Sequence, residues 1–138
     1  MADEPLGNLP IDHVAFAVRN TGDALRLYVE TLGLAAGLTE VAEDENLKIT
    51  FLTGANARVE ILEPLPGDSA VARFLEKRGE GVHHVCLVVP DLPAMLKRLQ
   101  LAGYQLVDEQ PRQNFHGRWL AFVHPKSTNG VMIELYQE

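Results

Sequence analysis

The fold is indicated by a stretch that occurs twice in the chain: Ile11–Val18 reads IDHVAFAV, and Val82–Val89 reads VHHVCLVV. Both copies are short apolar runs of the length and composition of a buried strand. They carry a histidine at the same place, His13 in the first copy and His84 in the second. Internal similarity of this kind indicates a duplicated architecture, so we interpret the two stretches as equivalent strands of two modules.

The same series of signals follows each copy. Thr21 and Asp91 are suited to cap the start of a helix, and apolar residues at helical spacing come after each of them. Both helical patterns stop at a glycine, Gly33 in the first copy and Gly103 in the second. Strand-like stretches complete each copy, and the last of them holds a single glutamate. The order strand, helix, strand, strand, strand is therefore predicted twice.

We predict an α+β protein made of two tandem βαβββ modules. The first module covers about 11–64 and the second about 82–137, and the whole chain, 1–138, is expected to be one domain. The linker, about 65–81, is expected to contain a helix over Ser69–Lys77, because its apolar residues form a helical stripe.

Strand periodicity predicts where the repeated polar side chains point. His13 shares a face with two alanines, whereas the bulky residues of that strand face the other way, toward the helix. Glu60 and Glu134 take equivalent places on the last strand of each module, and His84 takes the place of His13. A structural histidine and a solvated glutamate are the ordinary alternatives. If both carboxylates are buried, however, each costs several kcal/mol without a counter-charge. A divalent cation removes that cost and suits mixed nitrogen and oxygen ligands.

Composition and charge exclude several classes of protein. Apolar runs are far shorter than the ~20 residues of a membrane span, and Met1–Pro10 is acidic and lacks the pattern of a signal peptide. The single cysteine, Cys86, cannot form an internal disulfide, which is consistent with a reducing, cytoplasmic compartment. The net charge of −7 disfavours binding to nucleic acid.

Paired βαβββ modules with a repeated His…Glu pattern resemble the vicinal oxygen chelate superfamily, which includes glyoxalase I. This resemblance implies that the two modules form a curved sheet around a metal site. Two longer stretches, Asp68–His84 and Phe122–Leu135, are similar to methylmalonyl-CoA epimerases, and the segments Asp108–Arg112 and His116–Gly117 fit the same family. Glyoxalase I sequences tend to have an Asp-Pro-Asp-Gly turn before the last strand. This chain has His-Pro-Lys-Ser at His124–Ser127 instead, which favours the epimerases.

The resemblance implies an enzyme that interconverts (2R)- and (2S)-methylmalonyl-CoA by removing the C2 proton to give a metal-stabilised enolate. It implies a divalent metal, often cobalt, held by the residues that match the family's ligands: His13, Glu60, His84 and Glu134. The family has Gln or Glu at the second of these positions. A glutamate makes the site one unit more negative than a glutamine would, which weakens its attraction for an anionic substrate.

Epimerisation needs proton donors and acceptors on both faces of C2. The resemblance assigns one base to Glu134. Some relatives place the opposing glutamate on the strand before Glu60, but the matching position in this chain is Ile49. Glu60, a water molecule or Glu45 are the alternatives for the second base. Glu45 lies in an acidic run, Glu40–Glu45, that we otherwise interpret as a solvated loop.

The family match also suggests residues that bind the acyl-CoA substrate. From the matched segments we select Lys126, Ser127, Arg112 and His116, and further cations are available for the phosphates of CoA: Arg73, Lys77, Arg78 and Arg118. We expect Cys86 to be a small buried thiol near the site, and Trp119 and Phe122 to pack in the core. A homodimer is expected, with no nucleic-acid or membrane partner.

Two other functions remain open on the sequence. A glyoxalase-I-like lactoylglutathione lyase would use the same ligand set on a glutathione hemithioacetal. Non-catalytic members of the superfamily sequester small molecules, although four retained ligand positions disfavour that interpretation because sequestration needs no metal.

Overall fold

The computed structural model describes residues 8–138, so most of Met1–Pro10, the segment in which no signal peptide is expected, lies outside the described residues. The chain forms two compact units. One consists of His13–His83, and the other of the described residues up to Asp12 together with His84–Glu138. The four strands of the first module pair within one unit and those of the second module within the other.

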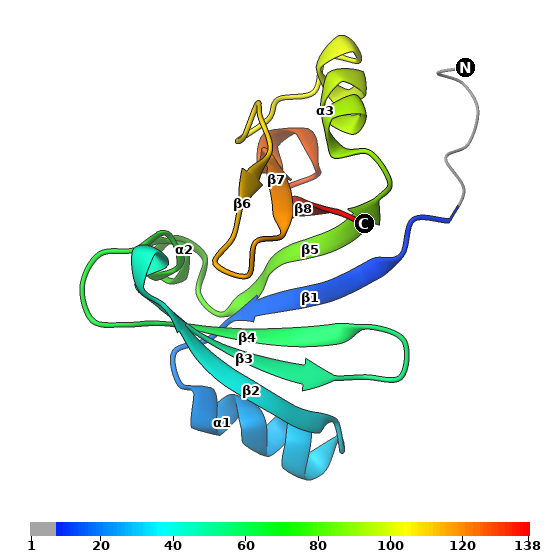
Figure 1. Ribbon diagram of the computed structural model, residues 1–138. Helices are drawn as coiled ribbons and strands as arrows, with labels where there is room; N and C mark the ends of the chain where they lie inside the picture. Colours follow the sequence, from blue (N-terminus) through cyan, green and yellow to red (C-terminus); the bar gives the residue numbers. More distant parts are fainter. Residues whose placement is uncertain (1–7) are drawn as a thin grey trace. The chain divides into compact units, whose positions relative to one another are not determined.

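The first module is a four-stranded sheet in the order β2-β3-β4-β1 (Figure 1). Strands β1 and β4 are parallel, and the other neighbours are antiparallel. A helix lies between β1 and β2, and a second helix follows β4. The elements are β1 (Ile11–Ala17), α1 (Thr21–Leu25), its π-helical continuation η1 (Arg26–Thr31), β2 (Ala35–Ala42), the 3₁₀ turn η2 (Glu43–Glu45), β3 (Leu47–Thr53), β4 (Arg58–Pro64) and α2 (Ala70–Arg78).

The two faces of this sheet pack against different helices. Val18, Leu52 and Ile61 form a buried cluster with residues of α1 and η1. Residues that alternate with these along the strands, such as Ala17 and Leu62, pack with Val71 and Leu75 of α2. The bulky face of β1 therefore lies under α1, as predicted, while the small face carries His13.

The second module repeats this order. Its sheet runs β5-β8-β7-β6, with β5 and β8 parallel and the other neighbours antiparallel. Asp91 caps the helix as predicted, because its Oδ1 accepts the backbone N–H of Ala94 at 3.0 Å. The elements are β5 (Gly81–Val89), α3 (Leu92–Leu101), β6 (Arg112–Gln113), β7 (Trp119–Val123), the 3₁₀ turn η3 (Pro125–Ser127) and β8 (Met132–Gln137). The prediction of two βαβββ modules is confirmed.

In the second module, α3 covers only one face of the sheet. Leu92 and Leu96 of α3 pack against Leu135, Ala121 and Val123. The residues that alternate with them form a separate cluster on the other face: Cys86, Leu120 and Tyr136, with Phe122 packed against it. This second face is the one that carries His84 and Glu134.

The first helix differs from the prediction at its start. Asn20, and not Thr21, is the N-cap: its Oδ1 accepts the backbone N–H of Asp23 at 2.9 Å. Thr21 instead donates its N–H and its Oγ1–H to Glu63 Oε1, each at 2.7 Å. A threonine held by a carboxylate of β4 ties the start of the helix to the sheet, a tertiary contact that helix-start signals do not reveal.

Two further expectations are wrong. The acidic run Glu40–Glu45 is not a loop throughout, because Glu40 to Ala42 belong to β2 and pair with β3. Trp119 is not a core residue: 44% of its surface is exposed, because it lies at the start of β7, beyond the buried part of its face. Phe122 is partly buried.

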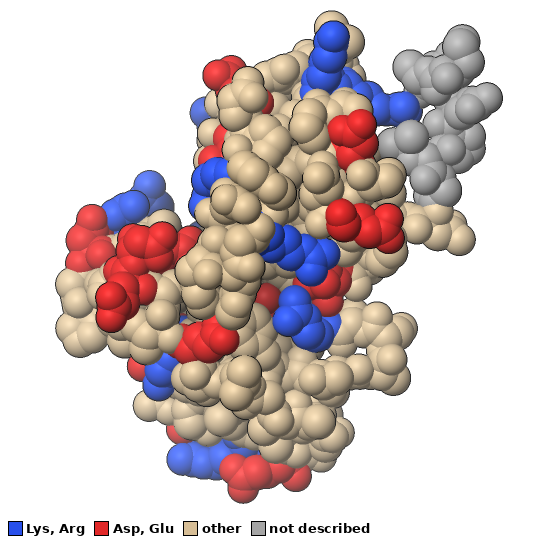
Figure 2. Space-filling view, in the orientation of Figure 1, with Lys and Arg blue, Asp and Glu red and all other residues tan. Residues whose placement is uncertain are grey.

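The surface charges are mixed. On the face drawn in Figure 2, Asp and Glu side chains (red) and Lys and Arg side chains (blue) are both scattered over the units. Among residues 8–138, no helix combines the length and the apolar character that crossing a membrane requires.

Candidate active site

The first module holds a buried histidine–glutamate pair. His13 is on β1 and Glu60 is on the parallel neighbour β4, where it is aligned with Ala15. His13 Nδ1 lies 3.3 Å from Glu60 Oε2, and the exposed fractions of the two side chains are 0% and 7%. The small side chain of Ala15 leaves room on this face for the glutamate to reach the imidazole.

The second module holds an equivalent pair. His84 is on β5 and Glu134 is on the parallel neighbour β8, aligned with Cys86. His84 Nε2 lies 3.1 Å from Glu134 Oε1, and the exposed fractions of the side chains are 8% and 6%. The ring of Phe122 packs edge-on against His84, with 5.6 Å between ring centroids and 87° between the planes. In each module the glutamate is aligned with the residue two places after the histidine.

Each histidine–glutamate pair is suited to form part of a metal site. An imidazole nitrogen and a carboxylate oxygen are ligands that many divalent ions accept together. Burial removes both groups from water, so an ion near each carboxylate would offset a desolvation cost of several kcal/mol. The residues present therefore fit a divalent cation. The structure brings the four predicted ligands together as two pairs, one in each module.

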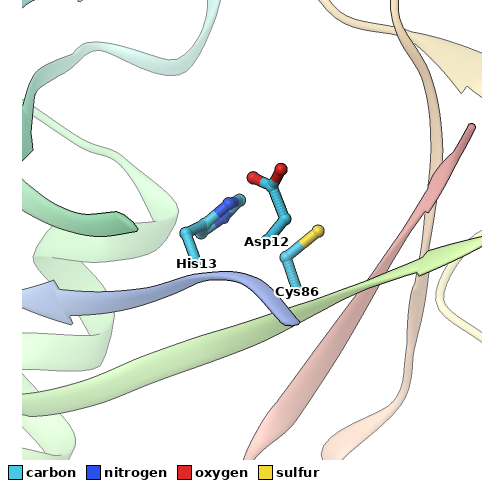
Figure 3. Close-up of side chains that lie close together, drawn as sticks. All are labelled: Asp12, His13 and Cys86. Atoms are coloured by element: carbon cyan, nitrogen blue, oxygen red, sulfur yellow. The ribbon is translucent and has the colours of Figure 1, made fainter. Parts of the chain in front are cut away.

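Asp12 and Cys86 lie next to each other in the second unit. Figure 3 shows the Asp12 carboxylate from β1 and the Cys86 thiol from β5 side by side, and the two groups lie within 4.8 Å of each other. Cys86 is fully buried, whereas Asp12 is partly exposed. Sequence reasoning did not single out Asp12. Its one signal is that it directly precedes His13 in the repeated stretch.

One of the predicted substrate-binding residues lies beside the second pair. The Arg112 guanidinium carbon is 5.5 Å from the centroid of the Phe122 ring, which in turn contacts His84. Arg112 Nε also donates to Asp108 Oδ1 at 3.1 Å, and Asp108 Oδ2 accepts the backbone N–H of Phe122 at 2.9 Å. Asp108 thus holds Arg112 over the ring.

The other three predicted substrate-binding residues are on loops. His116 is exposed between β6 and β7, with its ring 4.3 Å from that of Phe115. Ser127 Oγ accepts the backbone N–H of Gln105 at 2.8 Å, so this hydroxyl has a structural partner. The Lys126 side chain is exposed on η3.

The structure separates Glu45 from the first pair. Glu45 is exposed in η2, before β3, whereas Phe51 is the β3 residue aligned with Glu60. At about 3.3 Å per residue, the four steps from Leu47 to Phe51 alone span about 13 Å. Ile49 is aligned with Leu62 and is buried on the same face as Glu60, so the position of the missing glutamate does belong to the site face.

Comparison with known proteins places these modules in a class. Residues 12–122 match the family model of the Glyoxalase/Bleomycin resistance protein/Dioxygenase superfamily. An ethylmalonyl-CoA/methylmalonyl-CoA epimerase of Cereibacter sphaeroides is 37% identical over 129 residues, which cover 92% of this chain and 96% of that protein.

Solved structures agree with the sequence relatives. The crystal structure of methylmalonyl-CoA epimerase from Mycobacterium tuberculosis has a TM-score of 0.84 and 33% identity, covering 99% of this chain and 93% of that one. A methylmalonyl-CoA epimerase in complex with methylmalonyl-CoA and NH4+ has a TM-score of 0.82 and 30% identity, covering 94% of each chain. The chain therefore belongs to the glyoxalase superfamily and, within it, to the family of the methylmalonyl-CoA epimerases, which are enzymes.

Proposed function

We propose that this enzyme is a metal-dependent epimerase that interconverts (2R)- and (2S)-methylmalonyl-CoA. The observation that carries the proposal is the pair of buried histidine–glutamate contacts in equivalent strands of the two modules. It is supported by the names of the relatives and by the solved relative that contains methylmalonyl-CoA.

We propose that His13, Glu60, His84 and Glu134 form one metal site, which requires that the two modules belong to one domain. Two neutral imidazoles and two carboxylates balance the charge of one divalent ion, for which cobalt is our candidate. When bound, such an ion would draw electron density from the thioester and carboxylate oxygens of the substrate and so acidify the C2 proton.

The protein's own part is proton transfer and positioning. Glu134, buried beside His84, is proposed as the base that removes the C2 proton from one face. Returning a proton to the opposite face inverts C2. In the absence of a glutamate at position 49, Glu60 or a water molecule serves that face. Glu45 is not included in the proposal, because it belongs to η2 before the start of β3, whereas the β3 residue aligned with Glu60 is Phe51.

The substrate is proposed to lie along the face of the second module that carries Glu134, with Arg112 beside it and His116, Lys126 and Ser127 on the surrounding loops. The basic side chains available to the CoA phosphates include Lys126. The homodimer and the cytoplasmic location stay predictions, which light scattering and cell fractionation would test.

Metal dependence can be tested together with substrate identity. Protein stripped with a chelator is expected to lose epimerisation of (2S)-methylmalonyl-CoA and to regain it with one equivalent of Co²⁺ per chain. Full activity of stripped protein whose metal content has been measured as negligible would contradict the proposed mechanism. Turnover of a glutathione hemithioacetal in place of the CoA thioester would favour the lactoylglutathione lyase.

A further inference from the structure

Arg118 has a fixed position at the entrance to β7. Its backbone N–H donates to Asn114 Oδ1 at 3.0 Å, and its carbonyl accepts the backbone N–H of Asn114, also at 3.0 Å. The loop before it is closed by a bond from Gln113 Nε2 to the Gly117 carbonyl at 3.0 Å. Because hydrogen bonds on both sides fix the backbone at Arg118, less conformational entropy is lost when its side chain binds a ligand.

The Arg118 guanidinium lies on the face that carries Glu134. Its carbon atom is 4.3 Å from the centroid of the Tyr136 ring, a distance at which a cation and a ring attract each other. Tyr136 is 8% exposed and packs with Cys86 and Leu120. It follows Glu134 by two residues on β8, so the two side chains share a face and are about 7 Å apart along the strand.

Arg118 differs from Arg112 in its charged partners. Arg112 is paired with the Asp108 carboxylate. Arg118 makes no ion pair with any carboxylate of residues 8–138, and its side chain contacts the neutral Tyr136 ring instead. A partly buried cation without an acidic partner in the described residues, on the face that carries Glu134, is available to an anionic group of a ligand.

We propose that Arg118 binds the C2 carboxylate of the substrate and so makes the enzyme select malonyl-type CoA thioesters over simple acyl-CoA thioesters. This inference rests on the proposed function. The guanidinium fork matches the two oxygens of a carboxylate. The charge count agrees: two glutamates balance a divalent ion, the substrate carboxylate adds one negative charge, and Arg118 supplies the compensating positive charge.

The test compares two ligands that share the CoA moiety. Calorimetry would measure the Kd of methylmalonyl-CoA and of propionyl-CoA, which lacks the C2 carboxylate, for Co²⁺-loaded wild type, Arg118→Met and Arg118→Lys. We expect Arg118→Met to weaken methylmalonyl-CoA binding by about 10- to 100-fold, because a hydrogen-bonded charge is lost. Propionyl-CoA binding should change less than about 3-fold, and Arg118→Lys should fall between wild type and Arg118→Met.

A matched control removes a positive charge from the opposite side of the same sheet. Lys97 is exposed on α3, which packs on the other face of β7 and β8, so Lys97→Met should leave both Kd values unchanged. Equal weakening of both ligands by Arg118→Met would mean that Arg118 binds a CoA phosphate, and unchanged binding of both would mean that it binds neither group. Either result overturns the inference.

Different results would contradict the proposed function and the proposed role of Arg118. Wild-type protein that does not prefer methylmalonyl-CoA to propionyl-CoA would contradict the proposed function itself. A preference that is present in wild type and survives in Arg118→Met would overturn the Arg118 inference alone. If Arg118→Met does not fold, the Arg118→Lys comparison decides, because loss of the fork alone should still reduce the preference.

Discussion

His84 Nε2 and Glu134 Oε1 lie 3.1 Å apart on parallel neighbouring strands, and His13 and Glu60 repeat this relationship at 3.3 Å in the other module. Duplicated modules usually diverge where nothing constrains them. Here both copies bury a carboxylate, which is costly in an apolar core, against an imidazole at the same register. The two buried pairs are therefore the residues whose conservation between the modules indicates a shared function.

The first prediction concerns metal binding. Co²⁺ at 100 times its Kd should raise the free energy of unfolding of wild type by about 2.7 kcal/mol, since the folded state alone holds the site. His84→Ala should lose most of this gain in a thermal melt. His83→Ala is the matched control, because His83 is next to His84 but packs against Phe74 at 5.0 Å. A His84→Ala protein that binds Co²⁺ as tightly as wild type would rule out the assignment of this ligand.

The second prediction concerns the base. Glu134→Gln should reduce C2 exchange in D₂O by about 10²- to 10⁴-fold, because an amide cannot take the proton. Some metal should remain bound, since the amide oxygen can still act as a ligand. Glu109→Gln, on an exposed loop, is the control. If Glu134→Gln kept near-wild-type exchange from both epimers, Glu134 would be a ligand only.

The third prediction concerns Ile49, which is 8% exposed on the face of Glu60. Ile49→Glu should preserve or raise turnover, because it supplies a carboxylate to the face that lacks one. It should also lower the melting temperature, since a carboxylate is placed in an apolar cluster. Ile49→Gln has a similar size and polarity to Ile49→Glu but no basic group, so it should lose stability and turn over more slowly than Ile49→Glu. Equal activity of the two variants would show that position 49 takes no part in proton transfer.

The fourth prediction concerns acid stability. Burial raises the pKa of Glu63, but hydrogen bonds from Thr21 and the nearby Lys48 ammonium outweigh it, so the pKa lies below its ordinary value of 4.5. A lowered carboxyl pKa stabilises the fold above pH 4.5, and this contribution disappears as the pH falls through the folded-state pKa.

Thr21→Val should therefore lower the free energy of unfolding at pH 7 by about 0.5–1.5 kcal/mol. The difference from wild type should shrink in denaturant melts below pH 4.5. Thr31→Val is the control: Thr31 Oγ1 donates to the Arg26 carbonyl on an exposed turn, so its effect should not depend on pH. A Thr21→Val deficit that stays constant down to pH 2 would show that Glu63 is not the group responsible.

The modules could be predicted from the sequence because their signals are local. Strand alternation put His13 and His84 on the correct faces, and the glycines that end the helices do have positive φ angles, 86° at Gly33 and 90° at Gly103. These features depend on backbone sterics and on the period of a strand, which a single chain displays.

Other features depend on partners far away in the chain. Thr21 is bound by Glu63 rather than serving as the cap, Trp119 lies outside the core, and the Arg118 guanidinium rests on Tyr136. None of these features can be recognised from residue spacing in the sequence. Likewise, the closeness of Glu45 to Ile49 in the sequence does not reveal that Glu45 lies in η2, before β3 begins.

Epimerase activity is best tested by C2 hydrogen exchange of each methylmalonyl-CoA epimer in D₂O. The exchange is measured by NMR with Co²⁺-loaded wild type and compared with turnover of methylglyoxal plus glutathione. For a methylmalonyl-CoA epimerase we expect solvent deuterium at C2 from both epimers, with accumulation of the opposite epimer, and a much lower efficiency with the glutathione adduct. Comparable or greater efficiency with the glutathione adduct, or no exchange from either epimer, would contradict it.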